Sequence, residues 1–127
     1  MRILLDTHIF IWATTDDARL SPLARDLMLA ATEVYVSAAS IWEISIKSRL
    51  GKIDADPDVM VRAIATSGFR ELPVSAAHAA QIARLPHAAD HKDPFDRLLV
   101  AQSMVEPLVL LTADPKVVAY GSLTKLV

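Results

Sequence analysis

Four acidic residues stand at the borders of strongly apolar segments, a placement that suits metal-dependent chemistry on phosphate. They are Asp6, Glu43, Asp96 and Asp114. In an open parallel sheet the carboxyl ends of the strands meet at one crevice, so acids that follow strands gather there. Carboxylates held close together repel one another and stay ionised together only beside a cation. Because oxygen-only ligands favour Mg²⁺ or Mn²⁺ over zinc, these residues predict a magnesium or manganese site.

The first two acids also have structural explanations. Asp6 closes the apolar run of residues 3–5, where an unpaired carboxylate is costly to bury, but it could equally cap the following helix. Glu43 forms a capping-box pattern with Ser40, and it could also pair with Lys47 one helical turn later. The apolar neighbours of Glu43 nevertheless favour a carboxylate that faces inward.

The third and fourth acidic segments are expected to begin helices. Asp93 is a typical cap before a proline, whereas Asp96 lies in the first turn, where the helix dipole favours a carboxylate and free N–H groups attract phosphate. We assign Asp96 to the predicted metal site and Asp93 to a cap or supporting role, although the two could exchange roles. Asp114 could cap the next helical turn. Thr112 could orient a carboxylate or a metal-bound water, or simply bond to the backbone.

Basic side chains offer a local route to a polyanion, although a solvated helix end explains most of them equally well. The densest basic stretch comprises Lys47, Arg49 and Lys52. Arg97 adjoins the third acidic segment. Among the histidines we expect His78 to be structural, while His8 and His91 flank acidic positions and could touch phosphate. No two histidines have the i,i+4 spacing of zinc proteases.

Composition restricts the class of protein. A chain of 127 residues with 53% hydrophobic and 22% charged residues predicts one folded domain over residues 1–127. The absence of cysteine excludes disulfides, thiolate zinc sites and cysteine nucleophiles. The net charge of −2 means that any contact with nucleic acid must be local. No apolar run reaches membrane-spanning length and Asp6 comes too early for a signal peptide, so we expect a cytoplasmic protein without membrane contact.

The elements that must position these residues alternate between strands and helices. Strands are predicted at residues 2–6, 34–36, 69–74 and 108–111, with a last edge strand within 122–127. Helices are predicted at residues 8–15, 21–31, 40–51, 56–67 and 75–85, from 93 onwards, and as a short turn from 114, while 86–92 is expected to be a loop. This alternation predicts an α/β fold with a mostly parallel sheet, and the near-continuous apolar strand at 108–111 indicates that helices cover both faces.

Four segments together resemble the PIN-domain nucleases, specifically the toxin subunits of VapBC-type toxin–antitoxin pairs. The segments are Leu4-Leu5-Asp6-Thr7, Ser40-Ile41-Trp42-Glu43-Ile44, Asp93-Pro94-Phe95-Asp96-Arg97-Leu98-Leu99-Val100-Ala101-Gln102 and Leu111-Thr112-Ala113-Asp114. Each is weak alone, but all four in this order make a specific pattern that spans nearly the whole chain. The family's acidic quartet maps onto Asp6, Glu43, Asp96 and Asp114, because Asp96 stands just before the Leu-Leu-Val-Ala stretch.

The resemblance implies a compact sheet sandwiched by helices, a Mg²⁺ or Mn²⁺ cofactor, cleavage of single-stranded or structured RNA, homodimers, and inhibition by a cognate antitoxin. It makes the quartet catalytic metal ligands, with Glu43 a candidate for orienting the attacking water. Supporting roles fall to Asp93, Thr112 and Thr7, and RNA contacts to Lys47, Arg49, Lys52 and Arg97. The high hydrophobic fraction separately predicts a buried interface on the first two helices. Its expected members are Phe10, Trp12, Leu20 and Leu23.

Two alternatives use the same acids differently. A receiver-type signalling domain also binds Mg²⁺, but it needs an acidic pair at the end of the first strand, and Asp6 is followed by Thr7 and His8. A phosphatase with an aspartate nucleophile needs a second acid two residues later, where His8 stands.

Overall fold

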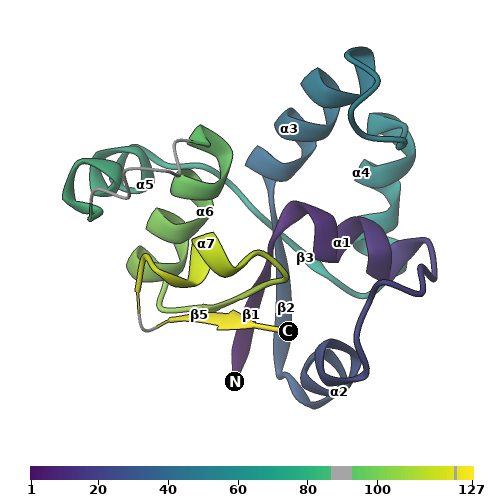
Figure 1. Cartoon of the computed structure of the whole chain (residues 1–127), viewed down its shortest axis with the longest axis horizontal. Helices are drawn as coiled ribbons and strands as arrows, with labels where there is room; N and C mark the ends of the chain where they lie inside the picture. Colours follow the sequence, from purple (N-terminus) through teal and green to yellow (C-terminus); the bar gives the residue numbers. More distant parts are fainter. Residues whose placement is uncertain (87–92, 122) are drawn as a thin grey trace.

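The computed structural model describes residues 1–86, 93–121 and 123–127, which form a five-stranded parallel sheet with helices on both faces (Figure 1). The strands are β1 (Arg2–Leu5), β2 (Glu33–Ser37), β3 (Arg70–Leu72), β4 (Val109–Thr112) and β5 (Thr124–Leu126). Their order is β3-β2-β1-β4-β5, and all pairs are parallel. The predicted α/β fold is therefore confirmed. The strand order changes direction between β1 and β4, and in open parallel sheets such a switch point opens a crevice at the carboxyl ends of the strands.

Most helices begin at a cap that the sequence predicted. They are α1 (Thr7–Thr14), α2 (Pro22–Ala30), α3 (Ala38–Arg49), α4 (Pro57–Thr66), α5 (Ala76–Gln81) with the 3₁₀ turn η1 (Ile82–Arg84), α6 (Pro94–Val105) and α7 (Pro115–Val118). Ser21, Asp56 and Ser75 each accept a hydrogen bond from a backbone N–H of the first turn that follows. After α3, Gly51 has φ +71°, a left-handed conformation that favours glycine.

Several predicted boundaries were wrong, and two of them, the start of α3 and the end of β3, lie beside the carboxyl edge of β2. Helix α3 begins at Ala38 rather than Ser40, because Ser37 is the cap and its Oγ accepts the Ala39 N–H at 3.0 Å. Strand β2 extends to Ser37 through its pairing with Leu72, so the helix starts directly at the end of the strand. Ser40 therefore lies inside α3, and the predicted capping box does not form. The partner strand of β2, β3, was predicted to reach residue 74 but stops at Leu72, because the proline that follows has no N–H to donate to a sheet.

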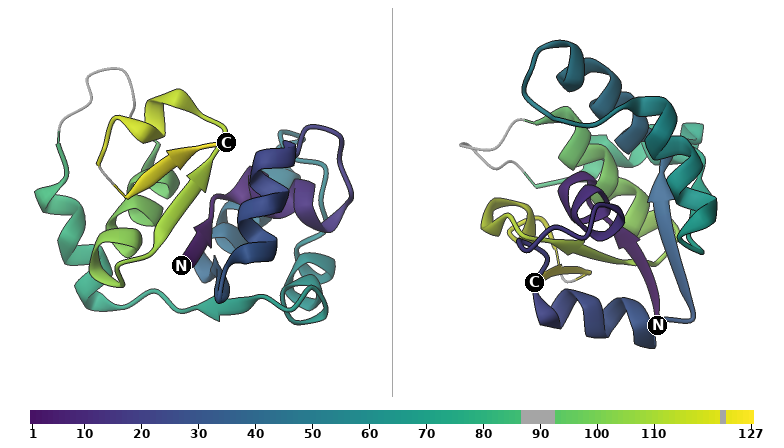
Figure 2. Two further views of the ribbon diagram at one scale, coloured as in Figure 1. Left: turned by 90° about the horizontal axis from the view of Figure 1, so that it is seen from below. Right: turned by 90° about the vertical axis from the view of Figure 1, so that its right-hand side faces the viewer.

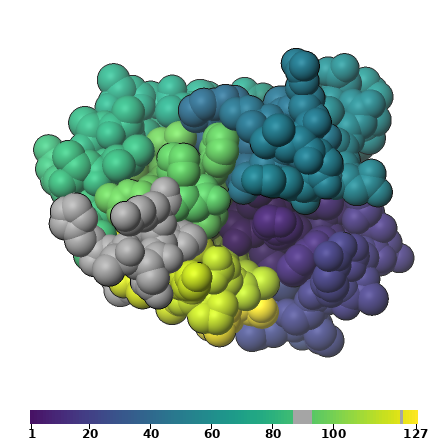
Figure 3. Space-filling model, turned by 45° about the horizontal axis from the view of Figure 1, so that its top comes forward, coloured from purple at the N-terminus to yellow at the C-terminus, as the bar shows by residue number. Residues whose placement is uncertain are grey.

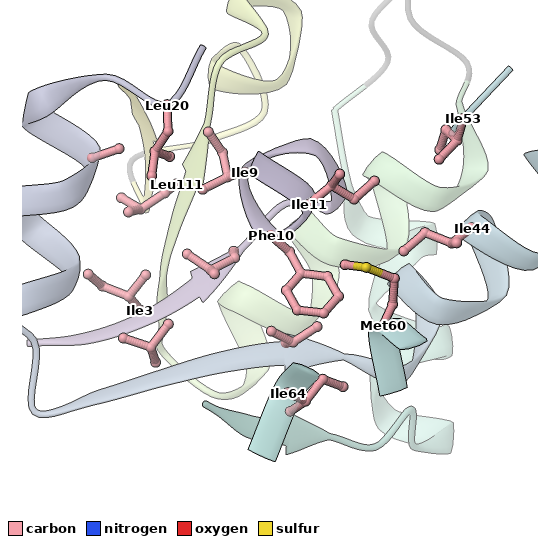
Figure 4. Close-up of a cluster of buried hydrophobic side chains, with 14 residues drawn as sticks. Ile3, Ile9, Phe10, Ile11, Leu20, Ile44, Ile53, Met60, Ile64 and Leu111 are labelled. Atoms are coloured by element: carbon pink, nitrogen blue, oxygen red, sulfur yellow. The ribbon is translucent and has the colours of Figure 1, made fainter. Parts of the chain in front are cut away.

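Alternating side chains of β1 supply both halves of the hydrophobic core. Ile3 and Leu5 pack with α1, α2, α3 and α4, while Leu4 packs on the other side with residues of α6 and α7. The side chains of Ile3, Leu4 and Leu5 have no exposed surface. Figure 2 shows these helical layers on either side of the strands, and Figure 4 shows Phe10 and Met60 inside the first half. Burial on both faces fixes β1, and with it the position of the residue that follows it.

The predicted partner surface on the first two helices was wrong for two of its members. Phe10 and Leu20 lie in the core, with 0% and 5% of their surfaces exposed. Trp12 is half-buried beneath the guanidinium of Arg19. Of the predicted set, only Leu23 is clearly exposed. Among the described residues, no helix has both the length and the apolar character that a membrane crossing requires.

Candidate active site at the carboxyl edge of the sheet

The predicted acids meet at one cavity of about 370 Å³. The described residues that line it are Asp6, His8, Glu43, Lys47, Asp93, Asp96, Asp114 and Lys116. These side chains come from the start of α1, from α3 and from the starts of α6 and α7, which are far apart in the sequence. Figure 3 looks onto the face where these four elements meet. The sheet therefore gathers all four predicted acids, and Asp93 with them.

Asp6 caps α1 and lines the cavity at the same time. Its Oδ1 accepts the Ile9 N–H at 3.0 Å, and its Oδ2 accepts the Thr112 hydroxyl at 2.6 Å. Burial raises the pKa of the Asp6 carboxyl, and these two hydrogen bonds oppose that effect. Both of the roles considered for Asp6 are thus compatible with one geometry, in which the carboxylate is held in a fixed orientation.

Glu43 faces inward, with only 2% of its surface exposed. Its Oε1 accepts the Thr7 hydroxyl at 2.6 Å, and its Oε2 accepts from the Lys47 ammonium at 2.6 Å. The Thr7 hydroxyl also lies 3.0 Å from the Ser40 hydroxyl, a contact that the sequence did not indicate. The predicted i,i+4 pair of Glu43 and Lys47 is confirmed.

Asp93 and Asp96 occupy different positions at the start of α6. Asp93 caps the helix through Oδ1, which accepts the N–H groups of Phe95 at 2.9 Å and Asp96 at 3.3 Å. Its Oδ2 lies 3.3 Å from the Lys47 ammonium. Burial raises the pKa of the half-buried Asp96 to about 7, assisted by the negative charges of Asp93 and the other three acids. Burial is the larger cause of this raised pKa, and the neighbouring carboxylates add to it.

Asp114 and Thr112 connect the end of β4 to the end of β1. Asp114 caps α7 through Oδ1, which accepts the Lys116 N–H at 2.9 Å. The Thr112 hydroxyl accepts the Asp114 N–H at 3.1 Å and donates to Asp6. Thr112 therefore orients a carboxylate and also bonds to the backbone, two of the three roles that the sequence left open.

The basic residues chosen from the sequence separate into two groups. Lys47 lines the cavity; burial would lower the pKa of its ammonium, but Glu43 and Asp93 together raise it. The other three lie outside the cavity lining. Arg49 and Lys52 are exposed at and just after the end of α3, and Arg97 donates to the Tyr120 hydroxyl at 3.2 Å.

The histidines and Lys116 are the remaining polar residues to place relative to the cavity. His8 lines the cavity beside the acids, as expected. His78 is buried and structural: its Nδ1 accepts the Ser75 N–H, and its Nε2 lies 2.6 Å from Glu106. His91 lies outside the described residues. Lys116 was missed by the sequence analysis, although its position in the helical turn after Asp114 would have indicated it.

Comparisons with known proteins were made for sequence and for fold. The sequence pattern of the PIN domain matches residues 3–122. Among curated proteins, none matches this chain in sequence. Three solved structures illustrate the similarity in fold, and all three have low sequence identity to this chain.

VapBC2 from Rickettsia felis, bound to a DNA fragment from its promoter, has a TM-score of 0.69 at 15% identity, over 99% of this chain and 98% of that chain. A toxin–antitoxin complex from Klebsiella pneumoniae has a TM-score of 0.65 at 18% identity, over 97% and 95% of the two chains. FitAcB from Neisseria gonorrhoeae has a TM-score of 0.60 at 20% identity, over 92% and 90%. These likenesses confirm the fold along almost the whole chain. Since the family pattern covers nearly all of the sequence, this chain belongs to the PIN domain family.

Proposed function

We propose that this chain is a Mg²⁺- or Mn²⁺-dependent endoribonuclease that acts as the toxin of a toxin–antitoxin pair. One observation supports this more than any other: five carboxylates line a single cavity at the carboxyl edge of the sheet. Membership of the PIN domain family favours a nuclease over the receiver-type alternative. Asp6, Glu43, Asp96 and Asp114 are the proposed catalytic residues, with Asp93, Thr112 and Thr7 in support.

The donor set fits a hard divalent cation. The described lining offers the carboxylates of Asp6, Glu43, Asp93, Asp96 and Asp114 and the His8 imidazole, without sulfur. The negative charges of the other acids add to the effect of burial in raising the pKa of Asp96. Within residues 1–86, 93–121 and 123–127, no three histidine, aspartate or glutamate side chains stand close enough together to hold an ion. Mg²⁺ usually takes only one or two carboxylates directly and keeps several waters, so the proposed site does not require three such side chains in contact with the ion.

The residues around the cavity have separable tasks in this proposal. A bound divalent ion would lower the pKa of an attacking water and would stabilise the charge that develops on the phosphate. Asp6 presents a carboxylate that Ile9 and Thr112 hold in place. Glu43 is held by Thr7 and Lys47, so orienting a water would require it to share an oxygen that already accepts a hydrogen bond.

RNA must be attracted by local charge because the chain has a net charge of −2. Lys116 and His8 line the cavity, where they are placed to meet a phosphate. Arg49 and Lys52 are exposed near the end of α3 and could contact RNA farther from the scissile bond. Arg97 is half-buried against Tyr120, which leaves it less free for this role.

A protein partner and a homodimer are part of the same proposal. The solved structures of similar fold include toxin–antitoxin complexes, which supports a cognate antitoxin here. Large apolar side chains remain exposed on two helices, a feature of surfaces that other proteins cover. They are Leu23 and Leu29 on α2, and Trp42 and Ile46 on α3. Light scattering on the purified chain at micromolar concentration tests the dimer, and a strictly monomeric protein would refute it.

Cleavage of single-stranded and structured RNA by the purified chain tests the enzyme. We expect cleavage with Mn²⁺ or Mg²⁺, loss of cleavage with EDTA, and loss of cleavage in Asp6→Asn, which keeps the cap on α1 because asparagine also caps helices. Circular dichroism confirms that the variant is folded. Cleavage that persists in both EDTA and Asp6→Asn would contradict the proposal.

A further inference from the structure

The ammonium of Lys47 lies between two carboxylates of the candidate site. Its Nζ is 2.6 Å from Glu43 Oε2 and 3.3 Å from Asp93 Oδ2. Glu43 stands one turn earlier on α3, whereas Asp93 belongs to the start of α6, 46 residues away along the chain. Lys47 thus links two of the elements that build the cavity.

The surroundings hold this ammonium inside the site. Only 24% of the Lys47 side chain is exposed, and Nζ lies 5.6 Å from the centre of the Phe95 ring. The Glu43 side chain is 3% exposed, so its charge would be costly to bury without a partner. The two oxygens of Glu43 are taken by Thr7 and Lys47, which makes Lys47 the only cation in contact with this acid among the described residues.

We propose that Lys47 is a built-in counter-cation of the site, one that neutralises Glu43 and Asp93 in the metal-free protein and opposes the binding of a divalent ion. This inference rests on the metal-dependent function proposed above. An ammonium fixed 2.6 Å and 3.3 Å from two carboxylates of the cavity repels a divalent ion that binds to the same groups, and it does so more strongly than the Lys116 ammonium, which no ion pair in the described residues holds against an acid. The same ammonium also occupies Glu43 Oε2, an oxygen that an ion could otherwise use. Lys47 is therefore a positioning residue rather than a contact to RNA.

This role has opposite consequences for two measurements. Removing the ammonium leaves Glu43 buried with an unpaired charge, so the metal-free protein becomes less stable. The same change removes a repelling charge from the cavity, so the ion binds more tightly. A lysine that only stabilised the fold would not tighten metal binding, and a lysine that only contacted RNA would change neither quantity.

The test measures Mn²⁺ binding by titration calorimetry and thermal unfolding with and without Mn²⁺. It compares the wild type with Lys47→Met, with Lys47→Arg, and with the matched control Lys116→Met. Lys116 lines the same cavity, but within the described part of the chain it makes no ion pair. All variants are compared at the same pH and ionic strength, because long-range charge effects depend on salt.

For Lys47→Met we expect a metal-free Tm about 5 °C lower and a Mn²⁺ dissociation constant about tenfold lower than in the wild type. Lys116→Met should change both quantities much less, and Lys47→Arg should resemble the wild type. If Lys47→Met does not fold, Lys47→Gln replaces it, because glutamine can still donate a hydrogen bond to Glu43, and the same tighter binding is expected.

Two outcomes separate failure of this inference from failure of the proposed function. If the wild type binds Mn²⁺ and neither neutral variant binds it more tightly than Lys116→Met does, the counter-cation role is overturned while metal binding stands. If the wild type binds no Mn²⁺ at millimolar concentration, the metal-dependent function and the counter-cation role both fall.

Discussion

The acidic cavity and the polar cluster around His78 differ in the number of partners that each carboxylate has. Glu106 meets a single ring nitrogen, His78 Nε2, at 2.6 Å, while Ser75 donates its N–H to the other ring nitrogen. Among the described residues, five carboxylates at the cavity share two lining lysines and His8, and the pKa of Asp96 is raised to about 7. The first cluster has a partner for its acid, whereas the second has more acid than it can neutralise. A matched cluster serves stability, and an unmatched one is suited to receiving a cation.

The difference between the two clusters is tested most directly by removing one carboxylate from each of them. We expect Asp96→Asn to lower RNA cleavage by about a hundredfold or more, because the proposed metal site loses an oxygen ligand. The matched change, Glu106→Gln, should leave cleavage within about threefold of the wild type and lower thermal stability instead. Initial rates at saturating Mn²⁺ measure the first effect, and melting curves measure the second. Equal losses of activity in both variants would contradict the distinction.

His78→Ala should destabilise the protein by about 2–4 kcal/mol, because it empties a buried site and removes the partner of Glu106. Urea unfolding in EDTA measures the loss. The increase in stability on adding Mn²⁺ should be the same in this variant as in the wild type, since His78 does not line the cavity. A changed response to Mn²⁺ would mean that the two clusters are coupled.

The pH dependence of stability sharpens the comparison. The pKa of Asp96 is raised from 3.8 to about 7 in the metal-free fold. At pH values between these two, the folded protein keeps a proton that the unfolded chain has released, so the free energy of unfolding falls as the pH rises, and it levels off above about pH 7. Asp6 contributes in the same direction because burial raises its pKa.

Urea unfolding from pH 4 to pH 8 in EDTA measures how the free energy of unfolding changes with pH. Asp96→Asn should flatten the slope, whereas Glu106→Gln should leave the decrease with rising pH in place. Adding Mn²⁺ should reduce the decrease, because the ion favours the ionised carboxylates. A wild-type slope no steeper than that of Asp96→Asn would refute the assignment of this proton to Asp96.

The smallest effect is expected from Thr112→Val, which keeps the shape of the side chain but removes the hydroxyl that donates to Asp6 at 2.6 Å. Mn²⁺ affinity should fall by about tenfold, because a less firmly oriented carboxylate binds an ion less well. Titration calorimetry measures this change, with Thr124→Val as the control, since Thr124 bonds to backbone carbonyls of Val118 and Gly121 outside the cavity lining. Equal affinities in the two variants would contradict the role of Thr112.

Local sequence signals predicted the positions of most of the acids because all but Glu43, which lies inside α3, stand at the end of a strand or the start of a helix. Asp6 and Asp114 follow predicted strands, and Asp93 precedes a proline that marks a helix start. Strand order then brings them together, and the parallel sheet followed from the alternation of strands and helices. The cap of α3 was predicted wrongly as Ser40: serine caps helices well at either position, and the pairing of Ser37 with Leu72 in the sheet places the helix start at Ser37.

Contacts between distant elements had no sequence signal. The Lys47–Asp93 contact joins residues 46 positions apart, and the His78–Glu106 pair joins residues 28 positions apart. Such distances depend on how helices pack, and hydrophobic periodicity does not specify that packing to within a few ångströms. The same limit explains why Phe10 and Leu20 were assigned to a partner surface: the sequence showed that they are apolar, but not which face of the chain they would cover.

The pairing of β1 with β4 joins parts of the chain that leave the ribosome at different times. The threonine that holds the Asp6 carboxylate follows Asp6 by 106 positions and emerges correspondingly later. A nascent chain that stops before β4 lacks both Thr112 and Asp114, and it lacks the neighbouring strand against which the end of β1 is fixed. For the proposed function this order means that the complete set of carboxylates exists only after β4 and Asp114 have been translated.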